Sequence, residues 1–309
     1  MNIVFAGTPD FAVPALKSII QGGYTISGVY TQPDRPAGRG RKLTQSPVKV
    51  LAQQHNLPVY QPETFRCEHA QATLASLHPD IMIVVAYGLI LPAAVLQIPR
   101  LGCINLHASL LPRWRGAAPI QRCIMAGDRE TGVTLMQIEQ RLDAGPMLFS
   151  DHCPVDEKET GQTLHDKLAA IGGTLLDNHL SSILSGNTLP KPQNEALSCH
   201  APKIGKAEAR IDWQDSATVI DRKIRAFNSW PVAETMLDNT MLRIWSAHPA
   251  PSAVPEGEPG ELLRTADHEL VVHCGDGSLY LDEVQLPGGR RMPIRDFLNA
   301  HPLLPSHLK

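Results

Sequence analysis

Three polar residues at the end of an apolar run could do chemistry in this chain. Asn105, His107 and Ser109 follow the apolar pair Cys103-Ile104 and lead into a loop that holds two prolines. An amide and an imidazole two residues apart can stabilise the oxygen of a carbonyl under attack, and open α/β sheets bind ligands at the carboxyl edge of their strands. A structural role, in which Asn105 and His107 only cap the strand and the following loop, is the alternative interpretation.

A carboxylate could complete this group. Asp143 lies in a turn between two strand-like runs, where Gly145-Pro146 constrains the backbone. By itself it could be a plain turn aspartate, but on a neighbouring loop at the same carboxyl edge it could handle protons. The sequence has no Ser or Cys in a nucleophile elbow, which favours direct transfer to an external nucleophile. A zinc site at His107 is disfavoured, because no H-E-x-x-H motif is present and the other His and Cys residues are dispersed.

The elements around these residues predict an α/β fold. Apolar runs at 3–6, 24–30, 81–86 and 134–138 alternate with helical patterns, which is typical of a Rossmann-like, doubly wound and mainly parallel sheet. The turn at 7–12 lacks the second and third glycines of a dinucleotide fingerprint, so a nicotinamide site is disfavoured. A helix is expected over 116–126, with its free backbone N–H groups near Asn105 and His107.

The spacing of strands and turns changes along the chain. We expect a catalytic domain over residues 1–189, a polar and Pro-containing linker over 190–206, and a smaller domain over 207–309. The last segment has five or six short strands, which favours a small β-barrel of the OB type. Because it has no group of residues like that at 105–143, we assign it to binding or positioning.

The charge pattern bears on partners. The whole chain carries a net charge of −3, and residues 207–309 hold ten Lys and Arg against fifteen Asp and Glu. A polyanion would therefore have to contact local clusters, above all the segment 34–49 with Arg35, Arg39, Arg41, Lys42 and Lys49 against Asp34. The alternative is a solvated, flexible loop. The six scattered cysteines, the lack of a signal-peptide pattern and the lack of a long apolar run predict a cytoplasmic protein with no membrane contact.

Several motifs resemble those of the folate-dependent formyltransferases. They are N-L-H-A-S-L-L-P from Asn105, R-W-R-G-A-A-P-I-Q from Arg113, L-D-A-G-P-M from Leu142, G-T-P-D-F-A-V-P-A-L from Gly7, T-Q-P-D-R-P-A-G-R-G-R-K-L from Thr31, and the 209–231 stretch. The resemblance covers essentially the whole chain, and it is closest to the members that act on initiator methionyl-tRNA. It implies transfer of the formyl group of 10-formyltetrahydrofolate, a co-substrate, to the α-amino group of methionine on that tRNA. The product is N-formylmethionyl-tRNA for translation initiation.

The resemblance also implies roles for single residues. Asn105 and His107 would polarise the formyl oxygen and hold the oxyanion, while Asp143 would orient His107 or accept a proton. The folate site would be lined by Ser109, Leu110, Leu111 and Pro112, with Tyr87, Gly88, Leu89 and Ile90 as its opposite wall. The acceptor arm of the tRNA would be contacted by Arg35, Arg39, Arg41, Lys42 and Lys206. No metal is implied, and the protein is expected to act as a monomer.

Two other functions remain open at this point. A related formyltransferase could deliver the group to a small amine, such as a sugar nucleotide or glycinamide ribotide, although this gives no reason for the basic segment at 34–49. A non-catalytic RNA-binding protein is the second alternative. It predicts that RNA binding survives replacement of Asn105, His107 or Asp143 and that no folate is turned over.

Overall fold

A computed structural model describes residues 1–37, 40, 42–251 and 254–309. The chain forms two compact units. The first unit contains Met1–Pro119, Glu130–Pro154 and His165–Ala201. The second contains Ile120–Arg129, Val155–Leu164 and Pro202–Lys309. No helix within the described ranges has the length and apolar character needed to cross a membrane.

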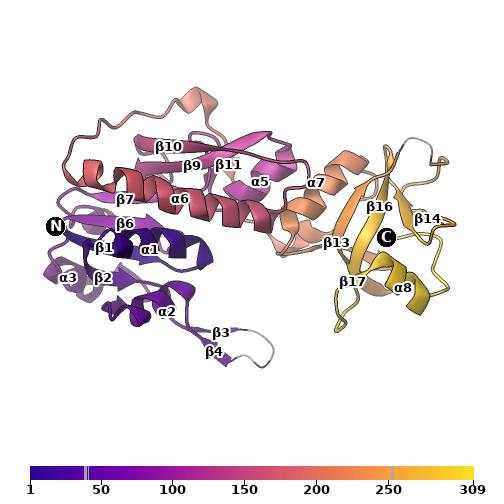
Figure 1. The fold of residues 1–309 in the computed structure, drawn as a ribbon, viewed down its shortest axis with the longest axis horizontal. Coiled ribbons are helices and arrows are strands. Elements are labelled where there is room, and N and C mark those ends of the chain that lie inside the picture. The colour runs from indigo at the N-terminus through magenta and orange to yellow at the C-terminus, as the bar shows by residue number, and fades with distance from the viewer. Residues whose placement is uncertain (38–39, 41, 252–253) are drawn as a thin grey trace. The chain divides into compact units, whose positions relative to one another are not determined.

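The first unit is built on a seven-stranded mixed sheet of order β10-β9-β7-β6-β1-β2-β5. Neighbouring strands from β7 to β5 in this order pair in parallel. Strand β9 is antiparallel to both of its neighbours, β7 and β10. The bounds of the strands, in chain order, are β1 Asn2–Gly7, β2 Thr25–Tyr30, β5 Val59–Tyr60, β6 Ile81–Val85, β7 Cys103–His107, β9 Glu130–Gln137 and β10 Met147–Pro154. The prediction of a Rossmann-like, mainly parallel sheet is confirmed (Figure 1).

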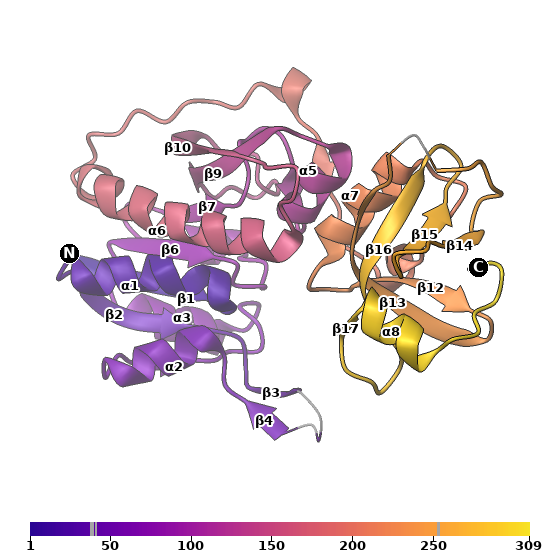
Figure 2. The ribbon, with the colours of Figure 1, turned by 45° about the vertical axis from the view of Figure 1, so that its right-hand side comes forward.

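Apolar residues on both faces explain why β6 is central. Every residue of Ile81–Val85 is buried, as expected for a parallel strand covered on both sides. The helices that surround the sheet are α1 Val13–Gln21, α2 Pro47–Gln54, α3 Glu68–Ser76, α4 Ala93–Leu96 and α6 Gly161–Leu184, with the 3₁₀ turn η1 at Asp10–Ala12. Helices α1 and α6 lie side by side over one face (Figures 1 and 2), and a Cβ on Gly173 of α6 would come within 3.0 Å of Pro14. The other face packs Met82 and Val84 against Ala70 and Leu74 of α3.

The structure differs in detail from three local predictions. The segment predicted as a loop at 34–49 contains a hairpin, because β3 (Arg35–Ala37) and β4 (Lys42–Thr44) pair as antiparallel strands before α2 begins at Pro47. The helix expected from Gly116 is α5, Pro119–Ala126, and Gly116 instead lies in the short strand β8 with Arg115. Residues 190–201, within the segment predicted as a linker, have regular structure over part of their length. They contain the 3₁₀ turn η2 (Glu195–Leu197) and β11 (His200–Ala201), which pairs with β8.

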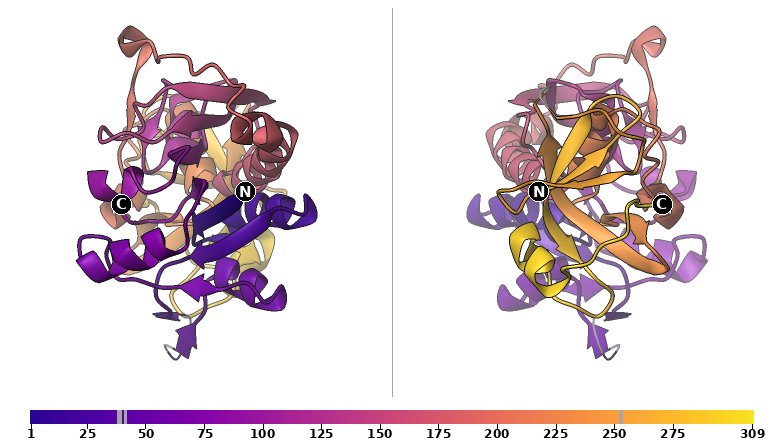
Figure 3. Two further views of the ribbon diagram at one scale, coloured as in Figure 1. Left: turned by 90° about the vertical axis from the view of Figure 1, so that its left-hand side faces the viewer. Right: turned by 90° about the vertical axis from the view of Figure 1, so that its right-hand side faces the viewer.

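The second unit contains a curled antiparallel sheet of order β12-β13-β16-β15-β14, with β17 beside β16 (Figure 3). Its elements are η3 Lys206–Ala209, α7 Ala217–Phe227, β12 Ala233–Leu237, β13 Thr240–Pro249, β14 Leu262–Arg264, β15 Leu270–His273, β16 Ser278–Gln285, β17 Met292–Pro293 and α8 Ile294–Ala300. The amphipathic helix α7 buries Ile220, Ile224 and Phe227 and is capped by the side chain of Ser216. The sequence did not predict β17 or α8.

The predicted barrel is a curled half-barrel whose two edge strands are bridged by the last residues of the chain. Met236 of β12 exchanges backbone hydrogen bonds with Lys309, while Leu262 of β14 donates to Ser306. Leu308 donates to the carbonyl of Gly260, next to β14. The edge groups of β12 and β14 are therefore satisfied by this segment, which protects the edges from pairing with another chain.

Candidate active site

The structure brings the three predicted catalytic residues together. Asn105 and His107 lie at the end of β7, and two residues apart they point to the same face of the strand. Asn105 Nδ2 donates to Asp143 Oδ1 at 3.5 Å, and His107 Nδ1 lies 3.8 Å from Asp143 Oδ2. An amide donor, an imidazole and a carboxylate therefore converge within one small region of the first unit.

The imidazole of His107 has a defined orientation. Its Nε2 lies 2.9 Å from the carbonyl oxygen of Trp114, and only 6% of the residue is exposed. A carbonyl can only accept a hydrogen bond, so Nε2 carries the proton of this contact. Nδ1 is then the ring nitrogen that faces Asp143. The hydrogen bond of one ring nitrogen to a backbone carbonyl is a common way to fix the orientation of a histidine and the role of its other nitrogen.

Asp143 reaches the site by a route that the sequence did not predict. It follows β9, which runs antiparallel to β7, so the expectation that both loops leave the same carboxyl edge of parallel strands was wrong. The loop turns back through Asp143, whose φ is 47°, and the backbone N–H of Gly116 donates to Oδ2 at 2.9 Å. Gly145 allows the tight return, because a Cβ there would lie 2.0 Å from the carbonyl oxygen of Gln137.

The segment at 109–112 is fastened internally. Ser109 is fully buried, its hydroxyl donates to the carbonyl of Arg113 at 2.6 Å, and its own carbonyl accepts from Thr134 Oγ1 at 2.7 Å. The backbone N–H of Leu111 donates to the same Thr134 hydroxyl at 3.2 Å. The hydroxyl of Ser109 is thus used to brace the loop. Leu111 is only 7% exposed, so the half-buried Leu110 and Pro112 are the residues of this segment whose apolar atoms a ligand could meet.

The residues predicted as the opposite wall fall into two groups. Tyr87 is 2% exposed, and its ring packs against Phe65 in the core with 6.2 Å between centroids. Burial raises the pKa of the Tyr87 hydroxyl. Leu89 packs against the same core, whereas Ile90 is 84% exposed and Gly88 has a φ of 87°. The Tyr87 side chain therefore points into the core, and only the backbone after it, with Ile90, is available to a ligand.

The basic segment at 34–49 is anchored to the first unit by hydrogen bonds at its two ends. Lys49 Nζ donates to Asp34 Oδ2 at 2.7 Å and to Gln61 Oε1 at 2.8 Å, and both charged side chains are mostly buried. The hydrogen bond from Lys49 lowers the pKa of Asp34. Arg35 donates to Gln32 Oε1 at 2.9 Å. Lys49 is therefore an anchor of the hairpin and not a free positive charge.

The remaining predicted tRNA contacts are only partly described. Lys42 is exposed on β4, and Lys206 is exposed at the start of η3 in the second unit. Arg39 and Arg41 lie outside the described residues. Along the described ranges, no group of three or more His, Cys, Asp and Glu side chains is arranged to hold a metal ion.

Sequence reasoning missed three residues beside the site. Arg115 is 1% exposed, and its guanidinium contacts Gln193 and Glu195. These contacts include a hydrogen bond from Arg115 that, with a second from Arg141, lowers the pKa of Glu195 to about 2. The only sequence signal was the Arg-Trp-Arg run at 113–115 among mostly apolar residues, and nothing in 190–206 identified the partners of Arg115.

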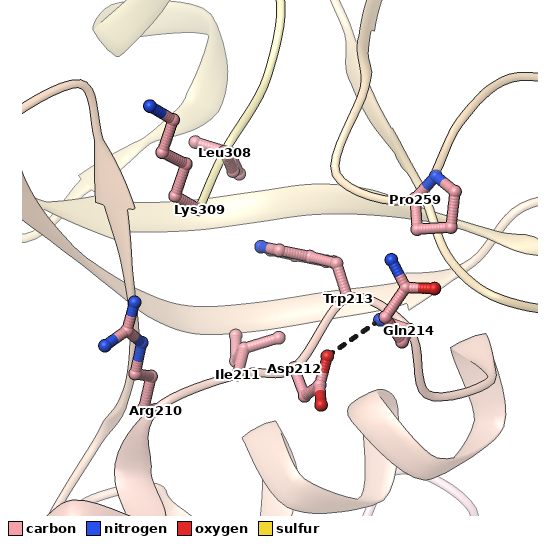
Figure 4. Close-up of a pocket in the computed structure, with 8 residues that line it drawn as sticks. All are labelled: Arg210, Ile211, Asp212, Trp213, Gln214, Pro259, Leu308 and Lys309. Carbon is pink, nitrogen blue, oxygen red and sulfur yellow. Dashed lines mark hydrogen bonds between the residues drawn. The ribbon is translucent and has the colours of Figure 1, made fainter.

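A pocket of about 380 Å³ in the second unit contains none of the predicted catalytic residues (Figure 4). It is lined by Arg210, Ile211, Asp212, Trp213, Gln214, Pro259, Leu308 and Lys309. The indole N–H of Trp213 donates to Thr235 at 2.9 Å, and Asp212 accepts from the backbone of Gln214 at 3.0 Å. These polar groups serve the fold of the unit, so the chemistry is better sought at Asn105, His107 and Asp143.

Comparison with known proteins identifies the class. Residues 1–180 match the family model described as formyl transferase, and residues 203–302 match that of the formyl transferase C-terminal domain. Among solved structures, an N-formyltransferase from Helicobacter canadensis, in complex with folinic acid and dTDP-3-aminofucose, aligns with a TM-score of 0.68 at 16% identity over 94% of this chain and 99% of that one. HypX from Aquifex aeolicus with tetrahydrofolic acid aligns with a TM-score of 0.65 at 18% identity, over 96% of this chain and 46% of that one. Similarity at this level shows the fold.

Curated relatives define the family more narrowly. The methionyl-tRNA formyltransferase of Methylococcus capsulatus is 55% identical over 100% of this chain and 99% of its own length. That of Pseudomonas entomophila is 52% identical over 97% of this chain and 96% of its own. The chain belongs to the methionyl-tRNA formyltransferase family.

Proposed function

We propose that this protein transfers the formyl group of 10-formyltetrahydrofolate to the α-amino group of methionine on initiator tRNA, in the cytoplasm and as a monomer. The identity of more than half the residues to full-length members supports the acceptor. The observation that carries the chemistry is the convergence of Asn105, His107 and Asp143, with Asp143 3.5 Å from the first and 3.8 Å from the second.

The residues present suit a formyl donor of this kind. Asn105 has an amide donor whose hydrogen bond to Asp143 is long, at 3.5 Å, so it can turn to a carbonyl oxygen. Leu110, Pro112 and Ile90 offer apolar surface to a flat heteroaromatic ring. Residues 109–112 and the backbone of 87–90 would then hold the folate, while the amide and the imidazole face the formyl group.

The proposed reaction needs no covalent enzyme intermediate. The amine attacks the formyl carbon, a C–N bond forms, and negative charge develops on the formyl oxygen. Asn105 would stabilise this charge through Nδ2–H, and His107 would do so through a proton on Nδ1, since its Nε2–H donates to Trp114. The amine then loses a proton, and Asp143 is the acceptor in the site. The bond from the formyl carbon to the folate nitrogen breaks, and that nitrogen takes up the proton that Asp143 accepted, which returns the carboxylate to its starting state. Because the folate nitrogen already activates the formyl group, the scheme requires no metal.

The acceptor would be selected outside this group of residues. We assign catalysis to residues 1–189, a connecting role to 190–206, and tRNA binding to 207–309. The hairpin of β3 and β4, with Arg35, Arg39, Arg41 and Lys42, would contact phosphates of the acceptor arm, and Lys206 would add a further contact. Support comes from the base of the hairpin, where Asp34, Lys49 and Gln61 hold it to the sheet.

A comparison of two acceptors tests this function. The purified protein is mixed with 10-formyltetrahydrofolate and either methionyl initiator tRNA or a dTDP-amino sugar, and each formylated product is measured. We expect formylmethionyl-tRNA and no formylated sugar. Turnover of the sugar nucleotide without any of the tRNA product would contradict the proposed acceptor, and RNA binding without turnover of either would contradict the enzymatic function.

A further inference from the structure

A segment that follows α6 is fastened to both loops of the candidate active site. We call residues 191–201 the strap. It runs past β10 and ends in β11 (Figure 1). Lys191 exchanges two backbone hydrogen bonds with Met147, each 2.8 Å long. At its other end, the carbonyls of Cys199 and Ala201 accept from Arg115 and from Ala117 and Ala118. The strap therefore joins the loop of Asp143 to the chain at 115–118.

One side chain of the strap contacts the catalytic loop directly. Gln193 is 9% exposed, and its Nε2 donates to the carbonyl of Asp143 at 2.9 Å and to that of Gly145 at 2.7 Å. Its Oε1 accepts from Arg115 Nε at 2.9 Å. Both amide protons and the amide oxygen have partners of the right kind, so these partners fix the orientation of the amide.

The backbone that Gln193 holds is one that aspartate adopts at a cost. Asp143 has a φ of 47°, in the left-handed region, which costs a non-glycine residue on the order of 1 kcal/mol. A hydrogen bond to the carbonyl of Asp143 itself, together with one to Gly145, stabilises this conformation. The carboxylate is held separately, by the N–H of Gly116. Asp143 is thus fixed through its main chain and its side chain.

Arg115 connects these two restraints. Its backbone precedes Gly116, which bonds the carboxylate, and its side chain bonds Gln193, which bonds the main chain of Asp143. A buried guanidinium needs a counter-charge, and Glu195 of the strap supplies it with contacts of 2.9 and 3.1 Å. Arg141, on the loop of Asp143, also contacts Glu195.

We propose that Gln193, oriented by Arg115, is a positioning residue that sets the placement of the Asp143 carboxylate against His107 and Asn105. This inference rests on the proposed function, in which Asp143 handles the proton. A misplacement of a reacting group by about 1 Å can cost on the order of 100-fold in rate, so loss of the Gln193 bonds should lower kcat more than it weakens substrate binding.

The test compares Gln193→Ala with Gln71→Ala. Gln71 is a half-buried glutamine of the same unit that donates to the carbonyl of Phe65 at 2.8 Å, away from the residues assigned to catalysis. We expect Gln193→Ala to lower kcat about 10- to 100-fold, with KM for folate and tRNA within about twofold, and Gln71→Ala to leave kcat unchanged. In an Asp143→Asn background, adding Gln193→Ala should lower the single-turnover rate by less than about twofold. Both changes act through the Asp143 carboxylate, so their effects on the rate should not multiply.

A second measurement is independent of activity. The amide proton of Gly116 reports its hydrogen bond to Asp143, and its NMR signal should move upfield in Gln193→Ala but not in Gln71→Ala. If Gln193→Ala does not fold, Glu195→Gln, at an exposed position, takes its place. This change removes the counter-charge of Arg115, and it should also move the Gly116 signal upfield. An unmoved Gly116 signal, or an equal loss of kcat in the wild-type and Asp143→Asn backgrounds, would overturn the inference. A wild-type protein without turnover would instead count against the proposed function.

Discussion

The backbone N–H of Gly116 donates a hydrogen bond to Oδ2 of Asp143 at 2.9 Å. Gly116 is followed by a helix in the chain, but its N–H belongs to the two-residue strand β8. Its φ of 121° is one that a side chain rarely tolerates, and a Cβ would lie 2.7 Å from the carbonyl of Ala201. The close pairing of β8 with β11 and the placement of the catalytic carboxylate therefore depend on the same glycine.

Replacing this glycine should affect both stability and rate. For Gly116→Ala we expect a loss of about 1–3 kcal/mol in the free energy of unfolding, from backbone strain, and at least a tenfold lower kcat as the N–H moves away from Asp143. Gly23→Ala is the control, because Gly23 also has a positive φ of 72° but open space around it. It should cost about 1 kcal/mol and leave kcat unchanged. Chemical denaturation and steady-state kinetics measure the two effects, and equal kcat values would contradict the role of the Gly116 N–H.

The basic hairpin gives a prediction about salt. Neutralising Arg41 and Lys42 together, as Arg41→Gln with Lys42→Gln, should raise KM for tRNA and leave KM for folate unchanged. The slope of log affinity against log salt should become shallower by about one to two units, as expected when two phosphate contacts are lost. Neutralising Lys17 and Lys158, two exposed lysines outside the hairpin, removes the same charge and should leave the slope as it is. If both double variants behave alike, the hairpin is only a solvated surface.

The ion pairs of Glu195 in the strap should make the free energy of unfolding depend on pH. Hydrogen bonds from Arg115 and then Arg141 lower the pKa of Glu195 from 4.5 to about 2. A carboxyl group with a lowered pKa adds stability that is complete above its ordinary pKa and is lost as pH falls through the folded value. The advantage of wild type over Glu195→Gln should thus be constant above about pH 5 and shrink between 4.5 and 2. Urea midpoints across this range measure it, and an advantage that grows on acidification would argue against the pairing.

Local sequence patterns predicted the features that depend on neighbouring residues in the chain, such as single strands. The apolar run at 81–86 predicted a central strand, and the structure has it as β6, Ile81–Val85, with every residue buried. The pairing direction of β9 was missed, because a strand has the same residue pattern whether its neighbour is parallel or antiparallel. The Asn-x-His spacing placed Asn105 and His107 on one face, but the return of Asp143 depends on Gly145 and on contacts far along the chain.

The strap was the largest gap between sequence and structure. A polar, Pro-containing stretch without periodicity is typical of a linker, and the backbone bonds of Lys191 and Ala201 leave no trace in composition. Gln193 lies 50 residues from Asp143, so its contact follows from tertiary packing alone. The hairpin at 35–44 was hidden for a related reason, because its strands are three residues each and carry mostly exposed side chains.

The rate of formyl transfer by Asp143→Asn tests the central claim most directly. The protein in excess is mixed with 10-formyltetrahydrofolate and methionyl initiator tRNA, and formylmethionyl-tRNA is followed in a single turnover. Asp143→Asn should be slower than wild type by about 10²- to 10⁴-fold, as expected for the loss of a general base. Asp238→Asn, at an aspartate with a similar φ of 53° in a turn of the second unit, should match wild type. Equal single-turnover rates for wild type and Asp143→Asn would contradict the assignment of the reaction to this site.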